Sequence, residues 1–333
     1  MKKKYSLFIF LFLAVLIIGY HFYAASQAEK QITQLIEQQT AQRGDISVQY
    51  SDIEVTPFTG KFIISDLTII FGNHIERTKE ITVDLAYLDV LNFYLGGTEY
   101  ALKHLYEAEA LLLKPSYVNK ENFHQLSSDS LHLHFSGQAL DAIRSAVSDT
   151  AFSHNQQIQA RGSHLNLQVP QTLITGFKAN HFTYSGSVDA GKKLFWQEGN
   201  QKITMDSLTW TPMPSFQENY RFIIQGFEYQ PDAIPFQKAE FHAAPAAGSD
   251  LMEIHAELKS ELALVSADSK IEFSQPTGTS RLQDARITVT DFSPSFKRVL
   301  ENVEQLLSIS LPRNEQGIVI PLKGTLANPQ IGK

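Results

Sequence analysis

The chain has 333 residues, 43% of them hydrophobic and 19% charged, and it contains no cysteine. This length and composition are typical of a folded protein with a sizeable core, and the missing cysteine excludes disulfides, thiolate metal sites and cysteine nucleophiles. Lys2, Lys3 and Lys4 supply three of the 28 cationic residues, so the rest of the chain carries 25 cations against 35 acids, a net charge of −10. Such a chain has no basic surface for nucleic acid, and we expect no nucleic-acid partner.

The first 25 residues predict a membrane anchor. A four-residue cytoplasmic stub with three lysines precedes an apolar run over residues 5–25. A helix of that length spans about 30 Å, the thickness of a bilayer core, and the lysines favour a cytoplasmic N-terminus. The residues expected to contact the bilayer are Leu7, Phe8, Ile9, Leu11, Phe12, Leu13, Val15, Leu16, Ile17, Ile18, Tyr20, Phe22 and Tyr23.

A cleaved signal peptide is the alternative interpretation of this segment. The sequence AASQA (24–28) offers small residues at a suitable spacing, with cleavage after Ser26 or Ala28. Cleavable apolar regions usually run about 7–15 residues, and this one is longer, so we favour the retained anchor. Under either interpretation residues 30–333 are exported.

An amphipathic helix is expected over residues 26–44. Ala28, Ile32, Leu35 and Ile36 fall on one face of this helix, and glutamines occupy the other. Gly44 is a natural stop signal. We expect the helix to pack against the first strands of the exported part.

After residue 44 the hydrophobic period changes to two, which is typical of strands. In DISVQYSDIEVTPF (45–58) the alternation changes phase, which predicts a bulge near Ser51 and Asp52. Thr59 and Gly60 predict the next turn. Further strands are expected at 61–71, 79–90, 131–135, 163–169, 182–188, 193–197, 201–210, 220–229, 252–265, 285–292 and 317–324. Strands with short turns between them favour an all-β meander or sandwich.

Helices are few in the exported part. SPSFKRVLENVEQLL (293–307) predicts a helix with Ser293 as N-cap and Pro294 at its first position. A weaker helical pattern lies at 138–147. No linker rich in proline, glycine or serine divides the chain, so we expect one elongated domain over residues 45–333.

The search for catalytic chemistry finds one near match to a phosphate-binding loop. GSVDAGKK (186–193) has the right glycine spacing, but Lys193 replaces the serine or threonine that should hold magnesium. It also lies between two expected strands, with no helix to receive a phosphate. We therefore expect a hairpin turn at Asp189, Ala190 and Gly191.

Histidines and paired acids give no site either. His132 and His134 lie two residues apart in LHLHF, so they share one face of a strand, which we expect to face solvent. Asp52 with Glu54, and Glu107 with Glu109, have the same spacing, and nothing in their surroundings selects one pair as catalytic. We expect a protein that is not an enzyme, with no catalytic residue, metal or cofactor.

The order of the elements resembles the AsmA-like group of bacterial envelope proteins, which includes TamB. The resemblance rests on the anchor, the polar helix, ISVQYSDIEVTPFTGKFIISDLTI (46–69), KEITVDLAYLDVLNFYLGG (79–97) and EYALKHLYEAEALLLKPSYVNKENF (99–123). In this pattern residues 88–95 match a short helix, Gly96 and Gly97 a turn, Leu102 and Leu105 a strand, and Leu111, Leu113 and Val118 the next strand. That alignment favours two strands over a helix at 98–118.

The end of the chain, GIVIPLKGTLANPQI (317–331), is also similar to the C-terminal signature of this family. The resemblance covers residues 1–125 and 285–333, whereas 126–284 agrees only in being rich in strands. Many relatives are longer than this chain. The fold that the resemblance implies is mainly β: an N-terminal transmembrane helix followed by an elongated, curved antiparallel β-sheet, groove-like or taco-like, with a few short helices.

The function implied by the resemblance is that of a bacterial inner-membrane protein of a Gram-negative cell envelope. It would have a single span, a cytoplasmic N-terminus and a periplasmic β-groove. The implied partners are phospholipid acyl chains, the inner membrane and other envelope proteins, in phospholipid transport or outer-membrane biogenesis. An envelope scaffold or assembly factor for outer-membrane proteins, with a closed sandwich core, is the alternative. The expected lipid-facing residues are Val48, Tyr50, Ile53, Val55, Ile81, Val83, Leu85, Leu131, Leu133, Phe135, Ile318 and Ile320.

Overall fold

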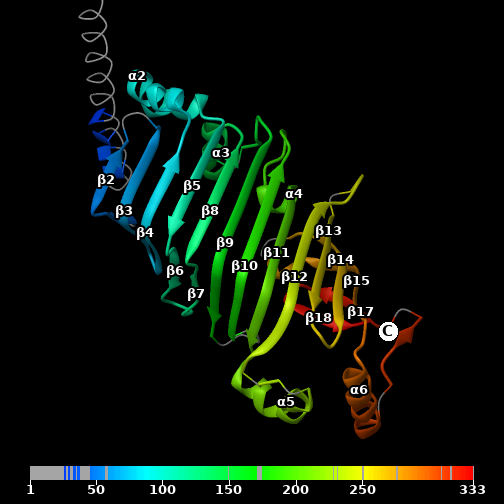
Figure 1. Cartoon of the computed structure of the whole chain (residues 1–333). Helices are drawn as coiled ribbons and strands as arrows, with labels where there is room; N and C mark the ends of the chain where they lie inside the picture. Colours follow the sequence, from blue (N-terminus) through cyan, green and yellow to red (C-terminus); the bar gives the residue numbers. More distant parts are fainter. Residues whose placement is uncertain are drawn as a thin grey trace, which may run out of the picture.

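A computed structural model describes residues 26–332, with short gaps at 28, 31–32, 35, 38–45, 57–58, 149, 171–174, 228, 231, 250, 275–276, 309 and 316. The chain is mainly β, and its strands form one large antiparallel sheet (Figure 1). The described strands therefore belong to one sheet rather than to two packed sheets.

The sheet is a meander in which each strand pairs with strands near it in the sequence. β1, β2 and β3 begin the sheet, β9 to β15 form its middle, and β16 to β18 end it. The strands are β1 Ile46–Gln49, β2 Asp52–Val55, β3 Lys61–Phe71, β4 His74–Asp84, β5 Glu107–Leu113, β6 Ser116–Asn119, β7 Gln125–Ser127, β8 Ser130–Ser136, β9 Gln156–Val169, β10 Thr175–Val188, β11 Asn200–Thr211, β12 Ile234–Pro245, β13 Met252–Lys259, β14 Leu264–Glu272, β15 Arg281–Thr290, β16 Arg313–Asn314, β17 Gly317–Thr325 and β18 Asn328–Ile331.

A crease, which is a line of unpaired residues, crosses the sheet from β1 to β12. At one level across these strands one or two residues of each strand are unpaired in the ladder, while the register is the same on both sides. Every second residue along the crease has a left-handed backbone, with φ of 51° at Asp66, Lys114 and His164 and 53° at Ser207. The residues of the crease are Ser51, Asp66, Lys79, Lys114, Asp129, His164, Asn180, Ser207 and Gln237, and all of them are polar.

The crease replaces the bulge expected near Ser51 and Asp52. β1 and β2 are interrupted there, as the change of alternation indicates, but Gln49 pairs with Thr68 and Asp52 with Ser65 in one register. The expectation of an inserted residue was therefore wrong. The side chains of the crease also hold one another, since Ser51 Oγ donates to Oδ2 of Asp66 at 3.0 Å.

Ser207 allows the backbone strain of the crease to be measured. We expect Ser207→Val to lower the free energy of unfolding by about 1–2 kcal/mol, because a β-branched side chain clashes with the backbone at positive φ. Ser207→Gly should raise it by up to about 1 kcal/mol. Urea unfolding followed by circular dichroism measures both. Ser185→Val, at an exposed position of ordinary strand conformation on β10, is the matched control. Equal effects at 185 and 207 would contradict a strained crease.

The helices lie mostly at the rims of the sheet (Figure 1). They are α2 Tyr87–His104, α3 Ala139–Ser148, α4 Phe195–Glu198, α5 Pro214–Gly226, α6 Pro294–Leu307 and the short 3-10 helix η1 Thr277–Thr279. The helices expected near 138–147 and 293–307 are confirmed as α3 and α6. At α6 the N–H of Phe296 donates to Oγ of Ser293 at 3.1 Å, which is the expected N-cap.

The expected strand around Leu102 and Leu105 is wrong. Residues 98–104 continue α2 as a second helical segment after a kink at Gly97, where φ is 72°. Ala101 and Leu105, one helical turn apart, are buried against the sheet. The expected helix at 88–95, the break at the glycines and the following strand β5 are all present.

Two other expected strands are helices. Residues 214–226 form α5 instead of a strand at 220–229, because Pro214 begins the helix and Phe216, Tyr220 and Ile224 recur with a helical period. Residues 195–198 form α4 instead of a strand at 193–197. There the Glu198 carboxylate accepts hydrogen bonds from the N–H groups of Lys193 and Leu194, which turns the chain back.

The main hydrophobic core lies beneath α2 at the beginning of the sheet. Val55, Phe62, Leu85, Val90 and Leu105 are buried together there. The helical residues between 26 and 37 that the structure describes join the same end, since Glu29 accepts a hydrogen bond from the N–H of Val55 at 3.0 Å. Three residues of the expected apolar face, Ala28, Ile32 and Leu35, lie outside the described residues, so the packing of that face stays a prediction.

Candidate functional site

One face of the sheet carries an unbroken row of apolar residues, which we call the first lane. Residues opposite each other on neighbouring strands share a face, so the register can be followed from β2 to β17. The first lane consists of Ile53, Ile64, Ile81, Leu112, Leu131, Gly162, Phe182, Met205, Ala239, Leu258, Val265, Val289 and Ile318. No charged or hydrogen-bonding side chain interrupts it.

A second lane runs beside the first, two residues further along each strand. It consists of Val55, Phe62, Val83, Ala110, Leu133, Ala160, Tyr184, Ile203, Phe241, Ala256, Ala267, Ile287 and Ile320. Tyr184 is its one polar member, and its hydroxyl donates to Oε1 of Gln201. Burial raises the pKa of Tyr184 to about 12, so this hydroxyl stays neutral at physiological pH.

The first lane is covered by little else in the described part of the chain. Of its members only Ile318 is buried, and the others are half-buried, as expected for side chains that contact their neighbours but have no layer above them. Figure 1 shows the strands from β3 to β12 side by side in a single layer, whereas the strands at the C-terminal end overlap one another in this view. The second lane is covered at its start by α2 and again near β10, where the ring of Trp196 in α4 lies 5.5 Å from that of Tyr184.

An apolar cavity of about 210 Å³ lies on this face across the crease. Ile81, Leu112, Leu131 and Phe182 of the first lane line one side of it, and residues from beyond the crease, such as Ile69, line the other. Gly162 leaves room for Phe182, because a Cβ at residue 162 would lie 2.0 Å from that ring. The crease thus joins the two halves of the apolar face.

The opposite face of the sheet is predominantly polar. One of its rows consists of Lys61, Asp84, Glu109, His134, Gln159, Ser185, Lys202, His242, His255, Asp268, Arg286 and Pro321. His132 and His134 both lie on this face, and His134 is 3.6 Å from the carboxylates of Glu107 and Glu109. The sheet is therefore amphipathic, and the charges of this row face away from the two lanes.

A charged network crosses the polar face at β13, β14 and β15. Nδ1 of His255 lies 2.7 Å from Oδ1 of Asp268, and Nε of Arg286 lies 3.3 Å from Oδ2 of the same carboxylate. The hydrogen bond to Asp268 raises the pKa of His255, and its counterpart lowers the pKa of Asp268. These groups neutralise one another on the surface.

The expected lipid-facing residues fall largely into the lanes. Ile53, Ile81, Leu131 and Ile318 belong to the first lane, and Val55, Val83, Leu133 and Ile320 belong to the second. Val48 lies on the same face beyond the crease. Phe135 lies on β8, two residues beyond Leu133 of the second lane, and Tyr50 follows β1. Leu85 belongs to the core under α2 rather than to an open surface.

Sequence reasoning missed the middle of both lanes, including Phe182, Met205, Phe241 and Ile287. The alternation in QKITMDSLTW and in PFQKAEFHAA carries the signal, but β12 was not expected at all. Only the strand register shows that these residues continue the rows begun by Ile53 and Val55.

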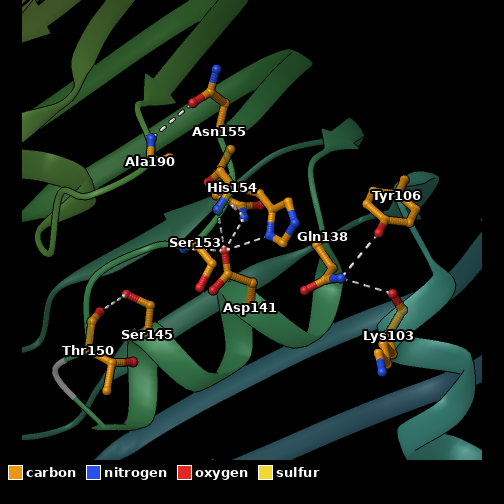
Figure 2. A network of polar contacts seen from close by, with 11 residues as sticks. Lys103, Tyr106, Gln138, Asp141, Ser145, Thr150, Ser153, His154, Asn155 and Ala190 are labelled. Carbon is orange, nitrogen blue, oxygen red and sulfur yellow. Dashed lines mark hydrogen bonds and ion pairs between the residues drawn. The ribbon is translucent and has the colours of Figure 1, made fainter.

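A polar network on α3 combines aspartate, histidine and serine, and it clamps a loop rather than forming a catalytic triad. Oδ2 of Asp141 accepts hydrogen bonds from the N–H groups of Ser153 (2.8 Å) and His154 (2.9 Å) and from Nε2 of Gln156 (3.1 Å) (Figure 2). The hydroxyl of Ser145 donates to the carbonyl of Thr150, not to the histidine.

The described residues contain no group of three or more metal-binding side chains, and the turn expected at 189–191 is present, with Gly191 at a φ of 88°. No helix in the part of the chain that the structure describes is long and apolar enough to span a membrane. The expected anchor at 5–25, with its bilayer-facing residues, lies outside the described residues.

Comparison of the chain with protein-family models, with curated proteins and with solved structures found no match.

Proposed function

We propose that this protein shelters the acyl chains of phospholipids along the apolar face of its sheet. The observation that carries the proposal is the pair of apolar lanes that cross the sheet from β2 to β17, the first of them open on one side. Large apolar surfaces of this kind on soluble domains mark sites for hydrophobic ligands, partners or membranes. A continuous track fits a long, flexible hydrocarbon chain better than a compact ligand.

The energetics suit reversible binding. Each methylene taken out of water contributes about 0.8 kcal/mol. Ten methylenes with one side in contact with a lane would therefore gain roughly 4 kcal/mol, half of their full burial. Such contact holds a chain on the sheet without trapping it, and movement along the lanes requires no nucleophile, metal or cofactor.

We infer that the protein works at the bacterial inner membrane, anchored by residues 5–25, with the sheet in the periplasm. The three lysines before the apolar run support this orientation. The order of the N-terminal elements supports kinship with AsmA-like proteins, and with it a role in phospholipid transport or outer-membrane biogenesis. In this proposal the bent, amphipathic sheet acts as the curved β-groove of that family.

Photo-cross-linking in cells tests the proposal at neighbouring residues that face opposite sides of the sheet. A photoreactive amino acid at Leu131 or Ile287, in the lanes, should capture phospholipid, which mass spectrometry of the purified full chain identifies. The same group at His132 or Arg286, on the polar face, should capture none. These pairs are adjacent in sequence, so differences in expression or folding are small.

Two results would count against the proposal. Equal capture on both faces would indicate contact with bulk membrane rather than a track. Absence of lipid at Leu131 and Ile287 would favour the alternative, an envelope scaffold or assembly factor whose apolar face binds a protein.

A further inference from the structure

A third row of the apolar face, beyond the crease, contains one charged residue, Glu76. This third lane consists of Val48, Ile69, Glu76, Tyr117, Leu126, Leu167, Phe177, Trp210 and Ile234. Neither of the other lanes contains a charge. Within the described residues no ion pair neutralises Glu76, although it is flanked in its lane by Ile69 and Tyr117.

Glu76 lies between the apolar cavity at the crease and the rim of the sheet. It lines the cavity at the crease, and it also lines a second hollow at the rim together with Ile46, Phe71 and His74. Ile69 and Tyr117 line both, so the two spaces adjoin. An amphiphile with its tail in the cavity would therefore place its headgroup beside this carboxylate.

Three aromatic rings form a row next to Glu76. The ring of His74 lies 6.1 Å from that of Phe71 and 5.8 Å from that of Tyr117, with interplanar angles of 21° and 26°. Nδ1 of His74 is hydrogen-bonded to the Tyr117 hydroxyl at 2.6 Å. The faces of aromatic rings attract cations, so the rings and the carboxylate favour the same charge.

We propose that Glu76, with Tyr117 and His74, binds the ammonium headgroup of a zwitterionic phospholipid whose tail lies in the adjoining cavity. This inference rests on the proposed function and names the class of lipid. A primary ammonium, as in phosphatidylethanolamine, fits best, because its three N–H donors can reach the carboxylate and the phenol oxygen. A quaternary ammonium needs rings that surround it, and these rings are stacked in a row.

The test measures which headgroup is captured next to Glu76. The full chain, with a photoreactive group at Leu126, is mixed with detergent micelles that contain equal amounts of phosphatidylethanolamine, phosphatidylcholine and phosphatidylglycerol. Mass spectrometry then gives the ratio of the captured lipids. We expect phosphatidylethanolamine to exceed phosphatidylglycerol about two- to fivefold, the range for an exposed ion pair.

Glu76→Gln should bring this ratio close to one, and Glu76→Lys should reverse it. Glu54→Gln, at an exposed glutamate of β2 that pairs with Ile63, is the matched control and should keep the ratio of the unmodified protein. Capture at Ile287 on β15, which does not line the cavity, should stay unchanged in all variants, which also shows that they are folded.

The outcomes separate this inference from the proposed function. A ratio that Glu76→Gln leaves unchanged overturns the headgroup site but not the lipid track. Equal capture of phosphatidylcholine and phosphatidylethanolamine overturns the preference for a primary ammonium. Absence of lipid at both Leu126 and Leu131 overturns the proposed function itself.

Discussion

Replacing Asp141 by alanine is expected to lower the free energy of unfolding by about 3–5 kcal/mol, the range for a buried charge whose removal leaves its hydrogen-bond partners unpaired. The Asp141 side chain is 9% exposed, and Oδ2 accepts hydrogen bonds from two backbone N–H groups and from the side-chain amide of Gln156. Removal of the carboxylate leaves the two backbone N–H groups without this acceptor, and it leaves Nε2 of the buried Gln156 with only the carbonyl of His154, at 3.3 Å. Chemical unfolding of the full chain measures the loss.

The loss of stability in Asp141→Ala should extend beyond α3, because the polar network around Asp141 connects several elements. Nε2 of Gln138 donates to the carbonyl of Lys103 and to the Tyr106 hydroxyl, and Asn155 accepts a hydrogen bond from the N–H of Ala190 (Figure 2). Amide hydrogen exchange in the variant should therefore increase in residues 150–156 and at the start of β9 before it increases elsewhere. Protection lost first in β13 or β14 would contradict this assignment.

The pH dependence of stability gives a second readout of Asp141. Burial raises the pKa of its carboxyl, but the hydrogen bonds from Ser153 and His154 outweigh burial, so the pKa lies below its ordinary value. Since the folded-state pKa is lowered, this stabilisation is complete above the ordinary pKa of about 3.9. It is lost as the pH falls through the lowered value. Asp141→Asn keeps an acceptor and should lose less stability, and it should remove this part of the acid sensitivity.

The local sequence predicts most strands and the side of the sheet on which their residues lie. A strand period of two, which needs no knowledge of partners, placed Ile53 and Val55 on one face. Val48 joined that face through the change of phase between ISVQY and DIEV. The change of phase at Ser51 also located the crease. Its mechanism could not be predicted, because the left-handed residues that accompany it lie on partner strands, such as Asp66 on β3.

The errors have two physical origins. In YRFII the apolar residues alternate, yet Phe216, Tyr220 and Ile224 also recur at helical spacing, and Pro214 decides in favour of the helix. Leu102 and Leu105 were assigned to a strand from the family resemblance, against the helical propensity of EYALKH. The lanes themselves depend on pairings between separate strands, which no single segment encodes. For that reason the partners of Ile53 and Val55 in the middle of the sheet were missed.

A negative charge in the middle of the first lane provides the strongest functional test. Met205→Asp places a carboxylate between Phe182 and Ala239, its neighbours in the lane. Because Met205 is half-buried, we expect a loss of stability of only about 1 kcal/mol. An acyl chain that passes this position would have to desolvate the carboxylate, which costs several kcal/mol. Photo-cross-linking of lipid at Val289, beyond the charge in the same lane, should therefore fall at least tenfold, by the relation of about 1.4 kcal/mol per factor of ten.

Comparing lipid capture on the two sides of residue 205 in the same variant shows why capture falls. Lipid that enters from the N-terminal end still reaches Leu131, so capture there should remain close to that of the unmodified protein. Thr204→Asp adds the same charge to the opposite face of β11 and should leave capture at both positions intact. If Met205→Asp lowers capture at Leu131 and Val289 equally, lipid does not travel along the lane from one end. If neither falls, chains bind each part of the sheet independently, and the apolar face is a set of separate sites rather than a track.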